Sequence, residues 1–297
     1  APTALPPPRA VRMACVIERR IYASPLRGAL KRRGLTSGDA YIQPPETYIY
    51  VYAIKQKNSR FALNQLIMLL ADAVRTSPPP ALAPAGLAAQ LAHPTGEAGR
   101  QIGLRMLRGN AALNQAALRV LDLQPASRVL EIGMGLAGLA RAISQAAPAG
   151  RYVGADRSAL MVAEAARAHA TAVARGQMKF VEADAVALPF GVASFERVLT
   201  VNTLYFWADP AAQVAEIRRV LAPGGRLVLA WRSEASMRHL PFVAHGFRLY
   251  ELPPVLTLLG EGGFRIRMAD TFAEPAAPEL GRNDAFESFI VVAEPVC

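Results

Sequence analysis

The sequence predicts an α/β fold built on a mostly parallel sheet with helices on both faces. From Pro125 onward, short apolar segments of strand length alternate with segments that carry a helical apolar period. This alternation is typical of βαβ units, in which successive strands run parallel and the intervening helices cover the sheet. A glycine-rich turn, residues 133–138, follows the first of these strands and precedes a helical segment. The length of 297 residues allows one large α/β domain with an appendage, or two modest domains.

Seven segments are expected to be the strands of this sheet. Each is a short apolar run, and helical segments separate most of them. The expected strands are residues 128–132, 151–155, 179–181, 197–201, 226–231, 264–268 and 288–293.

Helices are also expected before the sheet, between Gln101 and Leu121. Apolar residues recur there at helical spacing, and Gly103 and Gly109 are candidate interruptions of the pattern. The period is defined by Ile102, Met106, Leu113, Ala117 and Leu121. We therefore expect N-terminal helices that pack ahead of the first strand.

One later helix has signals at both of its ends. Asp209 suits the N-cap, Pro210 suits the first helical position, and residues 223–225 (Pro-Gly-Gly) are expected to end the helix. Its expected buried residues are Val214, Ile217 and Leu221.

The formal net charge of +10 is concentrated in one part of the chain. Residues 1–60 hold 11 Lys and Arg against 3 Asp and Glu, a balance of +8, which leaves 22 basic and 20 acidic residues, or +2, for the rest. The region around the glycine turn is therefore close to neutral. We expect no nucleic-acid binding, because the basic charge lies away from the candidate site.

Cysteine and histidine usage and hydropathy narrow the class of protein. Cys15 and Cys297 stand at opposite ends of the chain, so neither a disulfide framework nor a cysteine metal site is expected, and a reducing cytoplasm fits best. The longest uncharged apolar stretch, around residues 61–70, falls short of the roughly 20 residues that a membrane-spanning helix needs. With four histidines and no ligand cluster in the sequence, we expect no metal site.

Three glycines form a G-x-G-x-x-G turn between the first expected strand and a helix. Gly133, Gly135 and Gly138 lack a Cβ, which permits a tight turn and close approach of a ligand. Asp156 ends the next strand, where an acidic side chain accepts hydrogen bonds from ribose hydroxyls. Together these residues predict a cofactor that contains adenosine.

The order and spacing of four motifs resemble those of class I, Rossmann-like S-adenosylmethionine-dependent methyltransferases. The similarity is to the small-molecule type, which includes quinone-biosynthesis enzymes, and it covers about residues 90–297. It implies a seven-stranded, mostly parallel sheet with an antiparallel last strand. The motifs are VLEIGMG at 129–135, VGADRS at 153–158, VEAD at 181–184 with LPF at 188–190, and RVLAPGG at 219–225.

The resemblance also implies a division of the chain. Residues 127–297 would form the methyltransferase core, and residues 81–126 a helical lead-in that covers the active site. Residues 1–80 are basic, contain several prolines, show no motif and stay unassigned. We expect a solvated extension there rather than a transit peptide, because serine is sparse.

Cofactor contacts are implied at the ends of the first four strands. The methionine end of S-adenosylmethionine would face Glu131 and the glycine turn, where the carboxylate favours an ammonium group and amides at the start of the next helix receive a carboxylate. The ribose would lie at Asp156, adenine at Asp184, and the transferred methyl group near Asn202. The full set implied is Glu131, Gly133, Gly135, Gly138, Asp156, Arg157, Asp184, Ala185 and Asn202. One position departs from the family pattern, since Ala137 stands where a third glycine is usual.

Residues for the methyl acceptor are expected from two regions. Met106 and Asn110 belong to the helical lead-in, and Tyr205 and Trp207 follow the fourth strand at the edge where α/β sheets bind ligands. The reaction implied is direct displacement, in which alignment of the reactants matters most and a base is optional. Candidate catalytic groups are Tyr205 and His245, and His239 is a further candidate base.

Three other functions fit part of this pattern. A nicotinamide-dependent oxidoreductase would use the same glycine turn and Asp156, but Glu131 and the Pro-Gly-Gly before the fifth strand favour methyl transfer. A non-catalytic cofactor-binding protein would fit the altered position Ala137. The N-x-x-Y spacing of Asn202 and Tyr205 occurs in amino-group methyltransferases of nucleic acids, although the two prolines between those residues are missing here.

Overall fold

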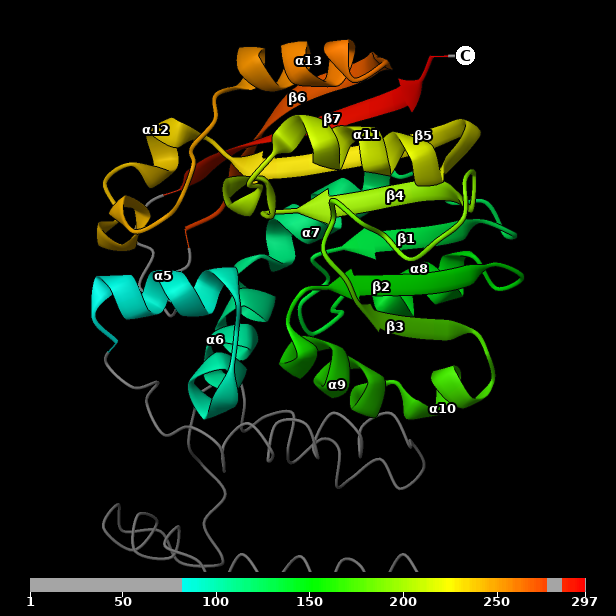
Figure 1. Ribbon diagram of the computed structural model, residues 1–297, viewed down its shortest axis with the longest axis horizontal. Helices are drawn as coiled ribbons and strands as arrows, with labels where there is room; N and C mark the ends of the chain where they lie inside the picture. The colour runs from blue at the N-terminus through cyan, green and yellow to red at the C-terminus, as the bar shows by residue number, and fades with distance from the viewer. Residues whose placement is uncertain (1–81, 277–284, 297) are drawn as a thin grey trace, which may run out of the picture. The chain divides into compact units, whose positions relative to one another are not determined.

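The computed structural model describes residues 82–276 and 285–296 (Figure 1). The expected N-terminal extension, residues 1–80, lies outside the described residues, as do Cys15 and Cys297. In the part of the chain that the structure describes, no helix is long and apolar enough to cross a membrane.

One seven-stranded sheet forms the centre of the described chain, in the order β3-β2-β1-β4-β5-β7-β6. Neighbouring strands pair in parallel from β3 to β5, whereas β7 runs antiparallel to both β5 and β6. The predicted sheet with an antiparallel last strand is therefore confirmed. The strands are β1 (Arg128–Ile132), β2 (Arg151–Asp156), β3 (Met178–Glu182), β4 (Phe195–Val201), β5 (Leu221–Arg232), β6 (Phe264–Glu274) and β7 (Phe286–Pro295).

The strand order reverses at β1 and β4, which are paired although β2 and β3 come between them in the chain. From β1 the chain moves outward to β3 and then returns to β4 on the other side of β1. Such a reversal leaves a crevice beyond the carboxyl ends of the two strands, where open α/β sheets bind ligands. In Figure 1 the arrowheads of β1 to β4 point toward α5 (Pro84–Ala92) and α6 (Gly96–Gly109).

Helices cover both faces of the sheet and bury two apolar clusters. On one face, α11 and α13 pack over strand residues that include Leu130 and Leu229. On the other face, α7 and α8 pack over the adjacent positions Val129 and Val228. This alternation follows from the strand geometry, because successive side chains point to opposite faces. The remaining elements are α7 (Ala111–Val120), α8 (Ala140–Ala146), α9 (Ala159–Ala168), α10 (Ala170–Ala174), η1 (Leu204–Phe206), α11 (Pro210–Val220), α12 (Glu234–Met237), η2 (Pro241–Ala244) and α13 (Leu252–Glu261).

Helices α5, α6 and α7 precede the sheet. Gly103, a candidate interruption in the sequence pattern, does not interrupt a helix. Helix α6 runs through Gly103 and ends at Gly109. A Cβ added at Gly103 would lie 3.0 Å from Cε of Met161 in α9. Glycine is therefore suited to this position because α6 and α9 approach closely there.

Helix α11 begins as predicted and ends before the expected stop. The Asp209 side chain accepts a hydrogen bond from the backbone N–H of Ala212 at 3.0 Å, so Asp209 is the N-cap. The helix ends at Val220, and Leu221 already pairs with Phe195 in the sheet. The Pro-Gly-Gly at residues 223–225 lies inside β5, where it forms an irregularity in the pairing with β4. The expectation that it ends the helix was wrong because the strand starts earlier.

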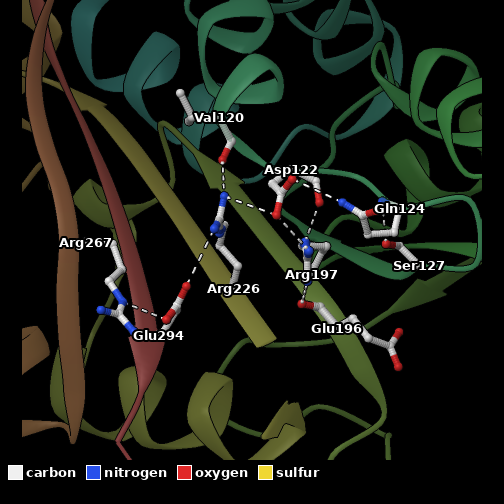
Figure 2. Close-up of polar contacts among 9 residues, drawn as sticks. All are labelled: Val120, Asp122, Gln124, Ser127, Glu196, Arg197, Arg226, Arg267 and Glu294. Atoms are coloured by element: carbon white, nitrogen blue, oxygen red, sulfur yellow. Dashed lines mark hydrogen bonds and ion pairs between the residues drawn. The ribbon is translucent and has the colours of Figure 1, made fainter. Parts of the chain in front are cut away.

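A network of charged side chains lies toward the amino ends of the parallel strands (Figure 2). Asp122, in the loop between α7 and β1, pairs with Arg197 of β4 at 3.2 Å and with Arg226 of β5 at 3.6 Å. Arg226 also pairs with Glu294 of β7 at 3.6 Å, and Glu294 pairs with Arg267 of β6 at 2.7 Å. These contacts hold the α7–β1 loop against the sheet at the end opposite to the crevice.

Candidate active site

A cavity of about 550 Å³ lies at the carboxyl ends of the parallel strands. Its walls are formed by residues at the ends of β1, β2, β4 and β5, by α5 and α6, and by several residues between positions 237 and 247. The volume is within the range of roughly 300–1,000 Å³ that is typical of small-molecule sites. The cavity therefore lies where the strand reversal predicts a ligand site.

The glycine turn forms one wall of the cavity. Gly133 and Gly135 have φ angles of 68° and 54°, a conformation that favours glycine. A Cβ at Gly133 would also meet the side chain of Thr203, so both the backbone conformation and the packing favour glycine there. A Cβ at Gly135 would meet nothing within 4 Å, which means that this position faces open space in the cavity. The turn thus leaves room for a ligand to approach the backbone.

Ala137 also adopts a backbone conformation that favours glycine. Its φ is 55° and its side chain is buried. The chain stays in turns up to Leu139, and α8 begins only at Ala140. The left-handed conformation costs a residue with a Cβ about 1–2 kcal/mol. The departure from the family pattern at this position therefore strains the turn.

Glu131 is a buried carboxylate on the cavity wall, at the end of β1. Its Oε2 accepts a hydrogen bond from the hydroxyl of Tyr152 at 2.7 Å. Burial raises the pKa of Glu131 to about 7, the Tyr152 hydrogen bond lowers it, and the charge of Asp156 raises it. A cationic group bound in the cavity would reverse this shift and favour the ionised form.

Asp156 ends β2 beside the glycine turn and connects the turn to the next helix. Its Oδ2 accepts a hydrogen bond from the N–H of Gly135 at 2.9 Å, and its Oδ1 accepts one from the N–H of Ser158 at 2.9 Å. Burial raises its pKa, and these backbone hydrogen bonds lower it. Each oxygen keeps a lone pair for a ligand hydroxyl. The neighbouring Arg157 lines the cavity and donates to the carbonyl of Ala92 in α5 at 2.9 Å.

Asp184 and Ala185 line the cavity after β3. Asp184 is exposed, and its Oδ1 accepts a hydrogen bond from the N–H of Val186 at 3.1 Å. An ion pair in α11 fixes the following LPF motif: Glu216 accepts from the N–H of Leu188 at 2.7 Å, and Arg219 donates to two carbonyls of the motif at 2.8 Å and 3.1 Å. These two residues were not found from the sequence, although Arg219 opens the fourth motif.

Asn202 and Tyr205 contact each other on the cavity wall, just beyond β4. The hydroxyl of Tyr205 donates to Oδ1 of Asn202 at 3.0 Å and accepts from the backbone N–H of Arg232 at 2.5 Å. Burial raises the pKa of Tyr205, so the phenol stays neutral. Nδ2 of Asn202 is buried without a hydrogen-bond partner among the described residues.

Arg232 is a cavity residue that sequence reasoning missed. It ends β5, and its guanidinium binds the fully buried carboxylate of Glu274 in β6 through two hydrogen bonds of 2.8 Å. Nη2 also donates to the carbonyl of Gly109 at 2.9 Å, and Ser288 donates to Glu274 at 2.6 Å. Burial opposes the charge of Arg232, but the Glu274 carboxylate raises its pKa. A charged residue directly after an apolar strand is the one sequence signal that could have found it.

The expected acceptor residues lie on the cavity wall, whereas one catalytic candidate does not. Met106, Asn110, Tyr205 and Trp207 all line the cavity, and so does His239. His245 is exposed and is not among the described residues that line it. Among the described residues there is also no group of three or more His, Cys, Asp or Glu arranged to hold a metal ion.

Residues 130–229 match the sequence family described as a methyltransferase domain. In these residues and in its sheet order, the chain is similar to class I, Rossmann-like methyltransferase domains. This match runs from within β1 to within β5 and includes the glycine turn, the acidic residues Glu131, Asp156 and Asp184, and the Asn202–Tyr205 pair.

Individual proteins agree with this assignment. The chain is 42% identical over 103 residues to a demethylmenaquinone methyltransferase of Thermus thermophilus, which is 34% of this chain and 46% of the relative. It is 37% identical over 126 residues to a malonyl-[acyl-carrier protein] O-methyltransferase of Alcanivorax borkumensis, 41% of this chain and 40% of the relative. The chain therefore spans less than half the length of each of these two relatives.

A solved structure resembles the methyltransferase domain in its fold. The complex between the Haloferax volcanii Trm112 methyltransferase activator and a methyltransferase contains a chain with a TM-score of 0.57 and 22% identity, and the match covers 67% of this chain and 95% of that one. At this level of identity the similarity supports the fold alone.

Proposed function

We propose that this protein is an S-adenosylmethionine-dependent methyltransferase that methylates a small-molecule acceptor by direct displacement. The observation that carries the proposal is the cavity at the strand reversal, which joins the buried carboxylates Glu131 and Asp156 to the open position at Gly135. The donor set fits the cofactor, because one carboxylate suits an ammonium group and the other suits ribose hydroxyls. When bound, the cofactor supplies a methyl group that is already activated on a sulfonium.

The residues of the chain would divide the work of binding. Glu131 and the glycine turn would hold the methionine end, Asp156 and Arg157 the ribose, and Asp184 with Ala185 the adenine. Asn202 would lie near the methyl group. These roles follow the strand ends on which the residues stand.

The main contribution of the protein to the reaction would be alignment. Well-oriented reactants recover roughly 7–11 kcal/mol of a barrier without a dedicated base. Helix α6 with Met106, its C-cap residue Asn110, and the segment after α12 would cover the acceptor and exclude water. The neutral, buried phenol of Tyr205 suits positioning rather than proton abstraction.

Cofactor binding separates this function from hydride transfer. Calorimetry of the full chain should give micromolar or tighter binding of S-adenosylmethionine and no comparable binding of NAD. Asp156→Ala should abolish the binding, whereas Asp270→Ala, at an exposed position of β6, should leave it unchanged. Binding of NAD without S-adenosylmethionine would refute the proposal.

The division of the chain into segments, its location in the cell and its lack of a nucleic-acid partner are part of the same proposal. We expect residues 127–297 to form the core, residues 81–126 to cover the active site, and residues 1–80 to be dispensable for cofactor binding. Two cysteines and the near-neutral charge after residue 60 support a cytoplasmic protein with no nucleic-acid partner. A deletion of residues 1–80 that loses both folding and cofactor binding would contradict this division.

A further inference from the structure

The charged residues of the cavity are distributed unevenly along the sheet. The acidic ones, Glu131, Asp156 and Asp184, lie at or just after the carboxyl ends of β1, β2 and β3, the half of the sheet assigned above to the cofactor. Arg232 ends β5, on the other side of β4. Among the described residues that line the cavity, no Asp or Glu comes from β4, β5 or the segments after them. Among the described lining residues, this acceptor half therefore offers the guanidinium of Arg232, which is paired with the buried Glu274, and no carboxylate, next to apolar walls.

Arg232 is held rigidly in this half and keeps one group of donors free. Its Nε and Nη2 are occupied by Glu274 and by the carbonyl of Gly109. Nη1 makes no hydrogen bond to any described residue, and the Arg232 side chain as a whole is 15% exposed. An arginine fixed by a carboxylate, with donors still available, is a preorganised site for an anionic oxygen.

The surroundings of Arg232 suit a flat apolar molecule. The ring of Phe286 lies 5.3 Å from the guanidinium carbon. Tyr205, Phe206 and Phe247 pack against one another with ring centroids 4.7–6.0 Å apart, and all three line the cavity. Aromatic walls favour an aromatic or similarly flat ligand.

We propose that the methyl acceptor is a flat, apolar molecule with a negatively charged oxygen, a carboxylate or a phenolate, and that Nη1 of Arg232 binds this oxygen and orients the acceptor. The inference rests on the proposed methyl transfer, because it assigns the acidic half of the cavity to the cofactor. Arg232 is then a specificity-determining residue that selects anionic acceptors over neutral or cationic ones.

Matched probe pairs test this inference on the full chain saturated with S-adenosylhomocysteine. Benzoate is compared with benzamide by calorimetry, and para-nitrophenolate is compared with para-nitroaniline by absorbance. In each pair we expect the anion to bind about 10- to 100-fold more tightly, the range for a charge-assisted hydrogen bond. The pair with the larger ratio identifies the source of the oxygen as a carboxylate or a phenolate.

A conservative variant isolates the role of Arg232. Arg232→Lys keeps a positive charge beside Glu274 but loses the planar group that provides Nη1. It should remove most of the preference for the anion and leave the affinity for S-adenosylhomocysteine unchanged. Arg226→Lys is the control, because Arg226 also lies in β5 and in an ion pair but is absent from the cavity wall. Thermal unfolding measures whether each variant is folded.

Each outcome separates this inference from the proposed function. If S-adenosylhomocysteine binds but neither anion is preferred, or if folded Arg232→Lys keeps the preference, the role of Arg232 is overturned and methyl transfer stands. If Arg232→Lys weakens S-adenosylhomocysteine itself as strongly as the anion, Arg232 belongs to the cofactor half and the inference is wrong. If S-adenosylhomocysteine does not bind to the wild-type chain, the proposed function fails.

Discussion

Glu131 makes cofactor binding depend on pH in a direction that the structure determines. In the free protein, burial raises the pKa of Glu131 to about 7, so the side chain is largely protonated in mildly acidic solution. The proposed site pairs its carboxylate with the ammonium group of the cofactor. Binding then requires the ionised form, and affinity should fall as the pH falls below about 7. The substitution Glu131→Gln removes the titrating group and keeps a similar shape.

The size of the effect follows from linkage. With a free-protein pKa of about 7 and a carboxylate that stays ionised in the complex, the dissociation constant should rise about 25-fold between about pH 7.5 and pH 5.5, roughly 1.9 kcal/mol. The stability of the free protein should change in the opposite sense. A carboxyl group whose pKa is raised by folding adds most to the free energy of unfolding below its unfolded pKa of 4.5. This stabilisation is lost as the pH rises through its folded pKa of about 7.

Calorimetric titrations of S-adenosylmethionine at several pH values, with wild type and Glu131→Gln side by side, provide the assay. The cofactor's own amino group titrates near 7.7–8.0, but it does so equally for both proteins, so the ratio of their affinities isolates Glu131. Asp156 also has a raised pKa and is present in both. A ratio that stays constant from about pH 7.5 to pH 5.5 would refute the assignment of Glu131 to the ammonium group.

Two further predictions concern stability. Ala137→Gly should raise the free energy of unfolding by about 1 kcal/mol, because it relieves the left-handed strain at a φ of 55°. As a control, Ala142→Gly inside α8 should lower the free energy of unfolding by about 1 kcal/mol. Urea denaturation measures both variants, and equal effects would contradict strain at Ala137. Glu274→Gln should cost about 3–5 kcal/mol, because it leaves the buried charge of Arg232 unpaired. Glu196→Gln, in a partly exposed pair with Arg128, should cost less than about 1 kcal/mol, and a similar loss in both variants would show that burial of the Glu274 pair is unimportant.

The strands could be predicted from sequence because each is a short apolar run between charged or turn residues. The cofactor side of the cavity could also be predicted from sequence. Glu131 and Asp156 end strands that pair in parallel, so the rule that ligands bind at carboxyl ends brings them together without knowledge of the packing. The N-cap of α11 at Asp209 could also be predicted from sequence, since capping depends on neighbouring residues alone.

The missed features depend on contacts between distant segments. The pair of Arg232 and Glu274 joins β5 to β6, which are separated in the sheet by β7, and no spacing rule connects them. Continuity of α6 through Gly103 depends on the approach of α9. The position of His245 depends on the course of the chain after α12, which has no regular period.

Transfer of a labelled methyl group tests the central claim most directly. The full chain is incubated with methyl-labelled S-adenosylmethionine and fractionated cell extract, and labelled product and S-adenosylhomocysteine are measured together. We expect label to enter a small-molecule fraction, with S-adenosylhomocysteine formed in equal amount, and we expect both to be lost in Asp156→Ala. Tight cofactor binding with no transfer into any fraction would contradict the account.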